Sequence, residues 1–168
     1  MDLFEAIAKR ACVRNLEAVE IPEEDLLKIL DAGRRAPSGS NRQPFEFLVI
    51  RQAETIQALA SAQSCIGDVS CAIALVADPE RSRWWLEDIS AATENMLLVI
   101  TALGYATVWI EGTLLRDEET HKRTLGVPEN LRLMILLPLG KAQEPVAPAP
   151  KRPLEEMVYW EKWGERRG

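Results

Sequence analysis

The stretch "LEDISAATENMLLVITALG", residues 86–104, is the longest apolar segment with helical character in this sequence. Its acidic residues Glu87, Asp88 and Glu94 lie toward the start, and apolar residues surround nearly all of its C-terminal half. A helix that is apolar on every side is a buried one. Gly104 then supplies the residue type that commonly follows the last turn of a helix. We therefore expect a central buried helix over residues 86–103.

The segments on either side of this helix predict a sheet and the helices that would cover it. Aliphatic, β-branched and aromatic runs predict strands at 45–50, 71–77, 105–110 and 131–140. Helical spacing and end signals predict helices at 3–10, 22–35, 54–63 and 117–125. Strands and helices do not alternate strictly, and no GxGxxG or GxxxxGKS/T loop occurs, so a Rossmann-type fold is disfavoured. The sequence predicts an α+β fold instead.

Composition and charge indicate one domain, residues 1–168, that is able to bury a sizeable core. The chain has 168 residues, 47% of them hydrophobic, and a formal net charge of −6. An acidic chain is a poor general binder of nucleic acid or anionic membranes, because such binding requires a surplus of Lys and Arg. Met1 is not followed by a basic leader, and no apolar run reaches about 18 residues, so we expect a cytoplasmic protein without a membrane span.

The cysteines and the single histidine argue against several kinds of catalytic centre. Cys12, Cys65 and Cys71 are odd in number and lack metal-type spacing, so we expect reduced, mostly buried thiols rather than disulfides or a zinc site. His121 lies in the charged stretch 117–126, and we expect it on a solvated helix face. A multi-histidine metal centre and a Ser-His-Asp triad are thereby disfavoured, and we expect no metal.

Three segments have the composition of a binding site or an interface. In an extended stretch "RACVR" (10–14), which we favour, the side chains of Arg10, Cys12 and Arg14 would project to one side; in a helix Cys12 would point away. "APSGSNRQPFEF" (36–47) is a polar elbow between a helix and a strand. The tail, 141–168, is rich in proline and then in aromatic residues, so it needs a surface to cover, on its own domain or on a second subunit.

These segments resemble the successive signatures of the FMN-dependent nitroreductase family. The motifs are "RACVR" (10–14), "APSGSNRQPFEF" (36–47), "AATENMLLVITALGYATVWIEG" (91–112) and "KRPLEE" (151–156), and together they span nearly the whole chain. The resemblance implies a central, mostly antiparallel sheet flanked by helices, and a homodimer with one FMN in each of two clefts at the subunit interface. It also implies that the C-terminal arm, 141–168, is exchanged between subunits, where it wraps the partner and adds an edge strand to its sheet.

By resemblance, cations from both ends of the chain would hold the phosphate of FMN, and an acidic protein must concentrate such cations at one place. They are Arg10, Lys151 and Arg152, with Cys12 beside them, and Arg14 would reach the ribityl chain and the pyrimidine edge. The alternative is that these are solvated surface charges.

The resemblance places the elbow of the partner subunit against the flavin ring. Small residues, Pro37, Ser38 and Gly39, would let the backbone come close, and Asn41 would offer its amide to the polar edge of the ring. Gln43 is either a further contact or a side chain that satisfies local backbone. The backbone N–H groups of Glu111 and Gly112 would face flavin N5; alternatively, Glu111 is a plain exposed carboxylate at a strand end.

This chain departs from the family's pattern at several positions. Cys12 stands where serine is common, and a thiol hydrogen-bonds weakly. FMN would therefore be held less tightly. Ala11 replaces a frequent arginine, which removes another possible cation, and Phe45 stands where tryptophan is common. The segment between the strand at 71–77 and the central helix is short, which leaves Trp84 and Trp85 either as the aromatic cover of the cleft or as ordinary packing at the start of the helix.

The function implied is that of an oxidoreductase. NADH or NADPH would pass hydride to flavin N5, and an electron-poor acceptor such as a nitroaromatic or a quinone would then take the electrons in a ping-pong cycle. Two alternatives remain. One is a specialised flavin enzyme of the same fold, such as a dehalogenase-like, flavin-destroying or dehydrogenating member, and the other is a non-catalytic dimeric flavin-binding protein.

Overall fold

The central helix of the computed structural model, which describes residues 1–166, is α4 (Trp85–Ala102). Ile89, Met96 and Ile100 are fully buried along one side of it, as the spacing of a core-facing helix requires. After α4, Gly104 has a φ of 77°, a left-handed conformation that glycine adopts without strain. The helix predicted over 86–103 is confirmed.

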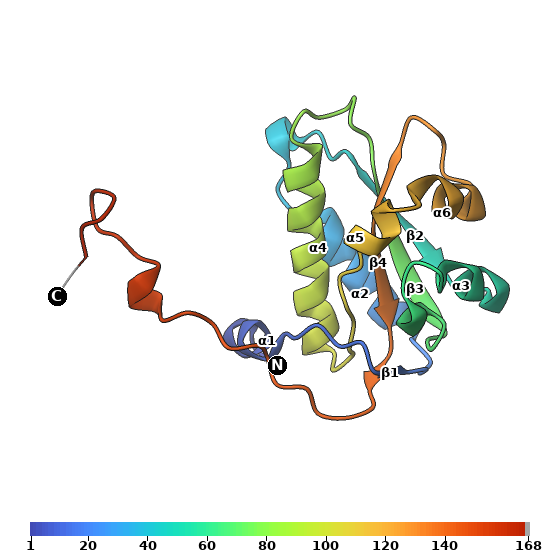
Figure 1. Ribbon diagram of the computed structural model, residues 1–168, viewed down its shortest axis with the longest axis horizontal. Coiled ribbons are helices and arrows are strands. Elements are labelled where there is room, and N and C mark those ends of the chain that lie inside the picture. Colours follow the sequence, from blue (N-terminus) through green and yellow to red (C-terminus); the bar gives the residue numbers. More distant parts are fainter. Residues whose placement is uncertain (167–168) are drawn as a thin grey trace.

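A three-stranded antiparallel sheet lies against this helix (Figure 1). β3 (Cys71–Ala77) is its middle strand and pairs with β2 (Phe45–Ile50) on one side and with β4 (Arg132–Leu139) on the other. A separate two-stranded sheet joins β1 (Leu16–Glu17) to β5 (Lys141–Ala142). β2 has no partner on its outer edge within the described residues. The open edge of β2 is therefore available to a further strand.

The alternation of side chains along β3 builds a core on each face of the sheet. Ile73 and Leu75 face α2 (Glu23–Arg34) and α4, whereas Ala74 faces α3 (Ala53–Leu59) and α5 (Gly112–Leu115). Figure 1 shows α4 and α3 on opposite sides of the sheet. The predicted α+β fold, an antiparallel sheet flanked by helices, is confirmed.

The remaining helices pack against those that flank the sheet, and one strand prediction is wrong. α1 (Leu3–Lys9) contacts α4, and α6 (Glu118–Leu125) contacts α3. The segment 105–110 is not a continuous strand but has isolated bridges, from Ala106 to Gly140 and from Ile110 to Leu136. The carbonyl of Thr107, between the bridges, accepts instead from Val13 N–H at 2.8 Å. The residues of this segment are apolar because the segment lies between the N-terminal stretch at Val13 and the end of β4, and not because it forms a continuous ladder of strand hydrogen bonds.

The expectation that His121 faces solvent is also wrong. Its side chain is buried, with Nε2 3.1 Å from the Oγ of Ser61, which lies in the turn just after α3. The charged residues around His121 mask this in the sequence, because α6 turns His121 toward α3 while Glu119 and Arg123 are exposed. His121 is a packing residue between two helices.

Gly140 lets the two sheets approach each other, and we expect its replacement by alanine to destabilise the fold. A Cβ at Gly140 would lie 2.6 Å from the backbone carbonyl oxygen of Glu17, and backbone cannot rotate away as a side chain can. Overpacking of this kind costs about 1–3 kcal/mol. Urea denaturation should therefore show a lower unfolding free energy for Gly140→Ala. Gly112→Ala is the matched control, because a Cβ there has nothing within 4 Å, and an equal loss in both variants would contradict the steric explanation.

The C-terminal arm predicted over 141–168 begins later than expected, because Lys141–Ala142 form β5 and the chain leaves the folded body only after Gln143. The backbone N–H of Gln143 donates to the carbonyl of Asn15, and its side chain donates to that of Leu16. Beyond this point the chain extends away from the body, as Figure 1 shows, and includes one short helical turn, η3 (Leu154–Glu156). Its large apolar side chains are exposed, namely Leu154, Met157, Trp160 and Trp163. Among residues 1–166, no helix has the length and hydropathy that a membrane crossing needs.

Candidate functional site

The segment after α1 presents a row of polar side chains over the body of the protein. Arg10 leaves the helix with φ −56° and ψ 123°, so the extended form favoured from the sequence is confirmed at this residue. Val13 is buried, while Cys12 and Arg14 are exposed and Arg10 is half-buried. This alternation places the two arginines and the thiol on the side that faces away from the core.

The contacts of Arg10 leave its charge only weakly compensated. Its Nη1 lies 3.9 Å from Cys12 Sγ, and its Nε lies 3.8 Å from a carboxylate oxygen of Glu94, which is half-exposed. Both distances are long for strong pairing. Cys12 is therefore beside Arg10, as expected, and the guanidinium retains the capacity to bind an anion.

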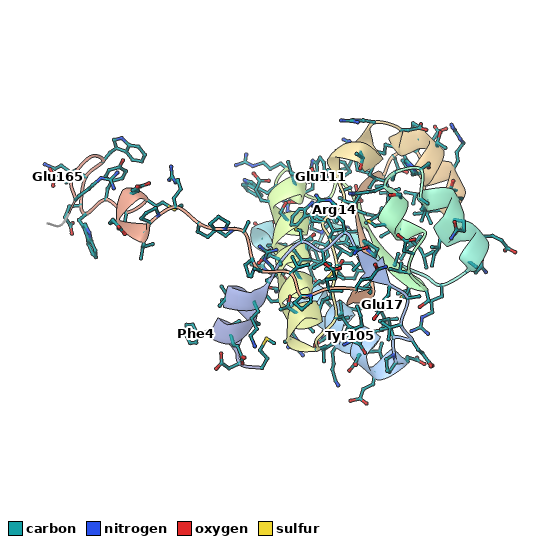
Figure 2. The ribbon with its side chains drawn as sticks, turned by 60° about the horizontal axis from the view of Figure 1, so that its bottom comes forward. Phe4, Arg14, Glu17, Tyr105, Glu111 and Glu165 are labelled. Carbon is teal, nitrogen blue, oxygen red and sulfur yellow. The ribbon has the colours of Figure 1, made fainter. Side chains whose placement is uncertain are left out.

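Glu111 and Gly112 present unused backbone donors at the start of α5. The N–H of Ile110 donates to Leu136, but neither Glu111 nor Gly112 donates a backbone hydrogen bond within residues 1–166. The Glu111 carboxylate accepts from Trp109 Nε1 at 2.9 Å, so it is not a plain exposed carboxylate. Figure 2 draws Glu111 and Arg14 in the same central part of the molecule. Two N–H groups can thus receive a polar atom of a ligand.

The elbow is held in a strained conformation by its own hydrogen bonds. Ser40, Asn41 and Gln43 have φ of 51°, 55° and 48°, a region that costs non-glycine residues about 1–3 kcal/mol each. Ser38 Oγ accepts from the N–H of Gln43 at 3.0 Å. The Gln43 side chain donates to the carbonyl of Asn41, which matches the local alternative for this residue. The amide of Asn41 makes no hydrogen bond within the described residues and is exposed.

Asp88 anchors the elbow to α4, a role that the sequence did not reveal. Its carboxylate is buried and accepts from the N–H of Gly39 at 2.8 Å and from Ser82 Oγ at 2.9 Å. The sequence marked Asp88 only as one of several acids near the start of the helix. A buried acidic residue in the first turn of a helix indicates such an anchor, but the burial of Asp88 is visible only in the structure.

Trp84 packs on the elbow, and Trp85 belongs to the first turn of α4. A Cβ on Gly39 would lie 2.5 Å from Cε3 of the Trp84 ring, so the indole rests directly on this glycine. The guanidinium of Arg132 lies 5.6 Å from the ring of Trp85. Trp84 is 38% exposed, so part of its ring is available for a ligand.

A single chain does not bring all the predicted residues together. The elbow lies at the N-terminal end of α4, whereas α1 and Arg10 lie farther along this helix (Figure 1). Lys151 and Arg152 are exposed on the arm, which extends away from the body that carries Arg10 and Arg14 (Figure 1). Pro37 and Ser38 stay with the elbow. The candidate site is therefore divided between separate surfaces of the chain.

The thiols differ in exposure. All three cysteines are free; Cys65 and Cys71 are buried, and Cys12 is exposed. Burial raises the pKa of the Cys65 and Cys71 thiols, and the charge of Arg14 opposes this at Cys65 only in part. Both buried thiols are therefore neutral near pH 7 and serve as core side chains.

Comparisons with known proteins identify the family. Residues 7–71 and 65–141 match the model of the nitroreductase family. A protein of Archaeoglobus fulgidus with the provisional name NADH dehydrogenase/NAD(P)H nitroreductase is 34% identical over 96% of this chain and 99% of its own length. The crystal structure of a nitroreductase family protein from Clostridium difficile 630 has a TM-score of 0.83 and 30% identity, over 96% of this chain and 99% of that one.

A third relative has been solved with a cofactor. It is a provisionally named nitroreductase from Desulfovibrio desulfuricans in complex with FMN, with a TM-score of 0.85 and 27% identity, over 97% of this chain and 98% of that one. The family model covers most of the chain, and the sequence and structure comparisons agree. The chain belongs to the nitroreductase family.

Proposed function

We propose that two copies of this chain bind two molecules of FMN and transfer electrons from NADH or NADPH to an electron-poor acceptor, such as a nitroaromatic or a quinone. When bound, FMN supplies the chemistry: it accepts hydride from the nucleotide and reduces the acceptor in a ping-pong cycle. Two relatives support this assignment: the Desulfovibrio desulfuricans protein, whose structure contains FMN, and the Archaeoglobus fulgidus protein, whose name includes NADH dehydrogenase and NAD(P)H nitroreductase.

The proposal rests on the backbone N–H groups of Glu111 and Gly112, which have no acceptor among residues 1–166, and on the row formed by Arg10, Cys12 and Arg14. Arg10 would hold the phosphate, and Arg14 would lie toward the ribityl chain and the pyrimidine edge. The two N–H groups would donate to the ring nitrogen where hydride is exchanged. Main-chain donors of fixed direction can stabilise developing charge there without a titrating side chain.

The residues present fit FMN in their chemistry. A phosphate requires cationic donors, and the guanidinium of Arg10 is weakly compensated. A flat ring requires close approach of backbone, and the elbow offers Pro37, Ser38 and Gly39 held by Asp88. The polar edge of the ring requires amide groups, and that of Asn41 is unused within the described residues. Lys151 and Arg152 would join from the arm.

A homodimer would complete this site, because the elbow and Arg10 lie at different places along α4. The outer face of α1 is apolar and exposed at Leu3, Phe4 and Ile7, and Figure 2 shows Phe4 at the surface. An exposed apolar patch of this kind, together with an apolar arm, marks a surface for another protein. The arm would cover the partner and add a strand to the open edge of β2. We expect the reaction in the cytoplasm, where free thiols persist.

The test is anaerobic reduction of the reconstituted protein. We expect the visible absorption of bound FMN to be lost when NADH or NADPH is added, and to return when menadione or a nitroaromatic compound follows. Absence of any reduction would contradict the oxidoreductase and favour a flavin-binding protein. Reduction without reoxidation by either acceptor would contradict the proposed acceptor class and favour a specialised flavin enzyme.

A further inference from the structure

Arginines surround the elbow although the chain as a whole is acidic, with a net charge of −6. Arg81 donates to the carbonyl of Gln43 at 3.1 Å and pairs with Glu46 at 3.4 Å. Arg42 donates to the carbonyl of Arg81 at 3.3 Å. The guanidinium of Arg83 lies 4.1 Å from the centroid of the Trp84 ring. These side chains come from two segments, 42–43 and 81–84, that meet at the elbow.

Two of these charges are not neutralised. Arg42 and Arg83 are exposed, and neither has an ion pair within residues 1–166, whereas Arg34 and Arg35 nearby both pair with Asp31. A carbonyl and an aromatic ring orient Arg42 and Arg83 but leave their charges available. The elbow is therefore bordered by two oriented guanidinium groups that can receive an anion.

Trp84 connects this cationic edge to the predicted cleft. Its indole rests on Gly39, the residue of the elbow that we place against the ring of FMN, and holds Arg83 at its face. A flat substrate lying next to Gly39 would therefore have an aromatic surface and a guanidinium beside it. Guanidinium groups bind carboxylates and phosphates through paired, directional hydrogen bonds.

From this juxtaposition we propose that Arg83, supported by Arg42, recognises an anionic group on the substrate that enters the cleft, and that Trp84 packs against the flat part of the same molecule. The inference rests on the proposed function and names a substrate class for it. The anion is a carboxylate on an aromatic acceptor or the additional phosphate that distinguishes NADPH from NADH. A carboxylate and a phosphate would bind a guanidinium in the same way, and the experiment below distinguishes them by using one substrate pair for each.

The experiment compares matched substrates in Arg83→Ala, Arg42→Ala and the double variant, each loaded with FMN. The acceptor pair is 4-nitrobenzoate and 4-nitrobenzyl alcohol, which differ in charge but share the nitroaromatic ring. The donor pair is NADPH and NADH, which differ by one phosphate. If the anion is a carboxylate, we expect Arg83→Ala to lower kcat/KM about threefold to tenfold for 4-nitrobenzoate and less than twofold for 4-nitrobenzyl alcohol. If the anion is the additional phosphate of NADPH, we expect the same difference between NADPH and NADH.

Controls distinguish charge from structure. Arg83→Lys keeps the charge and should recover part of the selectivity, and added salt should reduce it in the unmodified protein. Arg123→Ala on α6, an exposed arginine that donates to Thr120, should change neither pair. The proposal would be overturned if Arg83→Ala changed kcat/KM equally for both members of each pair, or changed it for none of the four substrates. If the protein still reduced 4-nitrobenzyl alcohol, the oxidoreductase assignment would stand although the role of Arg83 would not. If the protein reduced neither acceptor, both the role of Arg83 and the oxidoreductase assignment would be overturned.

Discussion

Replacing Arg10 with alanine is expected to weaken FMN binding by about tenfold to a hundredfold, because a hydrogen bond to a charged group contributes about 1.5–3 kcal/mol. Within residues 1–166, Arg10 has only long contacts to Cys12 and Glu94, at 3.9 and 3.8 Å. The fold therefore depends little on this side chain. Titration of the apoprotein with FMN, followed by flavin fluorescence, gives the dissociation constant.

The control for Arg10→Ala is Arg123→Ala, which removes an exposed arginine of α6 from the opposite side of the sheet. Both variants should keep the thermal unfolding midpoint and the oligomeric state of the parent protein. An unchanged affinity for FMN in Arg10→Ala would remove this residue from the site. Equal losses in both variants would indicate a general effect of net charge rather than a phosphate contact.

Removal of the arm is expected to abolish the dimer and, with it, tight binding of FMN. The structure places the cut after Glu144, because β5 and Gln143 are bonded to the N-terminal segment and belong to the body. The deleted part contains the exposed Leu154, Met157 and Trp163, whose burial on a partner would contribute about 1.5–3 kcal/mol each. It also contains Lys151 and Arg152.

Sedimentation velocity of the protein truncated after Glu144 measures this directly, and far-UV circular dichroism establishes that the body remains folded. We expect a monomer without bound flavin, or insoluble protein if the exposed face of α1 aggregates. A matched variant, Lys151→Ala with Arg152→Ala in the full chain, should stay dimeric while losing FMN affinity. A stable dimer that binds FMN without the arm would contradict the packing role assigned to it.

Local sequence signals predicted the parts of this fold that depend on local chemistry. The strands at 45–50 and 71–77 agree to the residue, since each is a short apolar run with turn residues on both sides. The segment 105–110 has the same composition but forms only two bridges, because its central carbonyl bonds to Val13. Whether such an apolar run forms a strand depends on hydrogen bonds to segments far away in the sequence, and the composition of the run does not contain this information.

The site was less predictable than the fold for a related reason. The resemblance to the family selected Arg10, the elbow and the Glu111–Gly112 backbone, and the structure adds their hydrogen-bonding state. Asp88 and Trp84 act on the elbow through contacts across about fifty residues of sequence, which no local pattern contains. His121 is buried because of the partner helix α3, not because of its neighbours in sequence.

If each FMN site combines Arg10 of one subunit with the elbow of the other, substitutions at these two places can be separated in a mixed dimer. One chain carries Arg10→Ala. The other carries Gly39→Val, whose side chain would displace the elbow by contact with Trp84 at 2.5 Å. Each variant alone should form dimers in which both sites are damaged.

Two different affinity tags allow the mixed dimer to be purified and titrated with FMN. If the sites are shared, one of them receives both substitutions and the other receives none, so the mixed dimer should bind one FMN with the affinity of the unmodified protein. If each site lies within one chain, both sites carry a substitution. Absence of any tight site in the mixed dimer would then contradict the account.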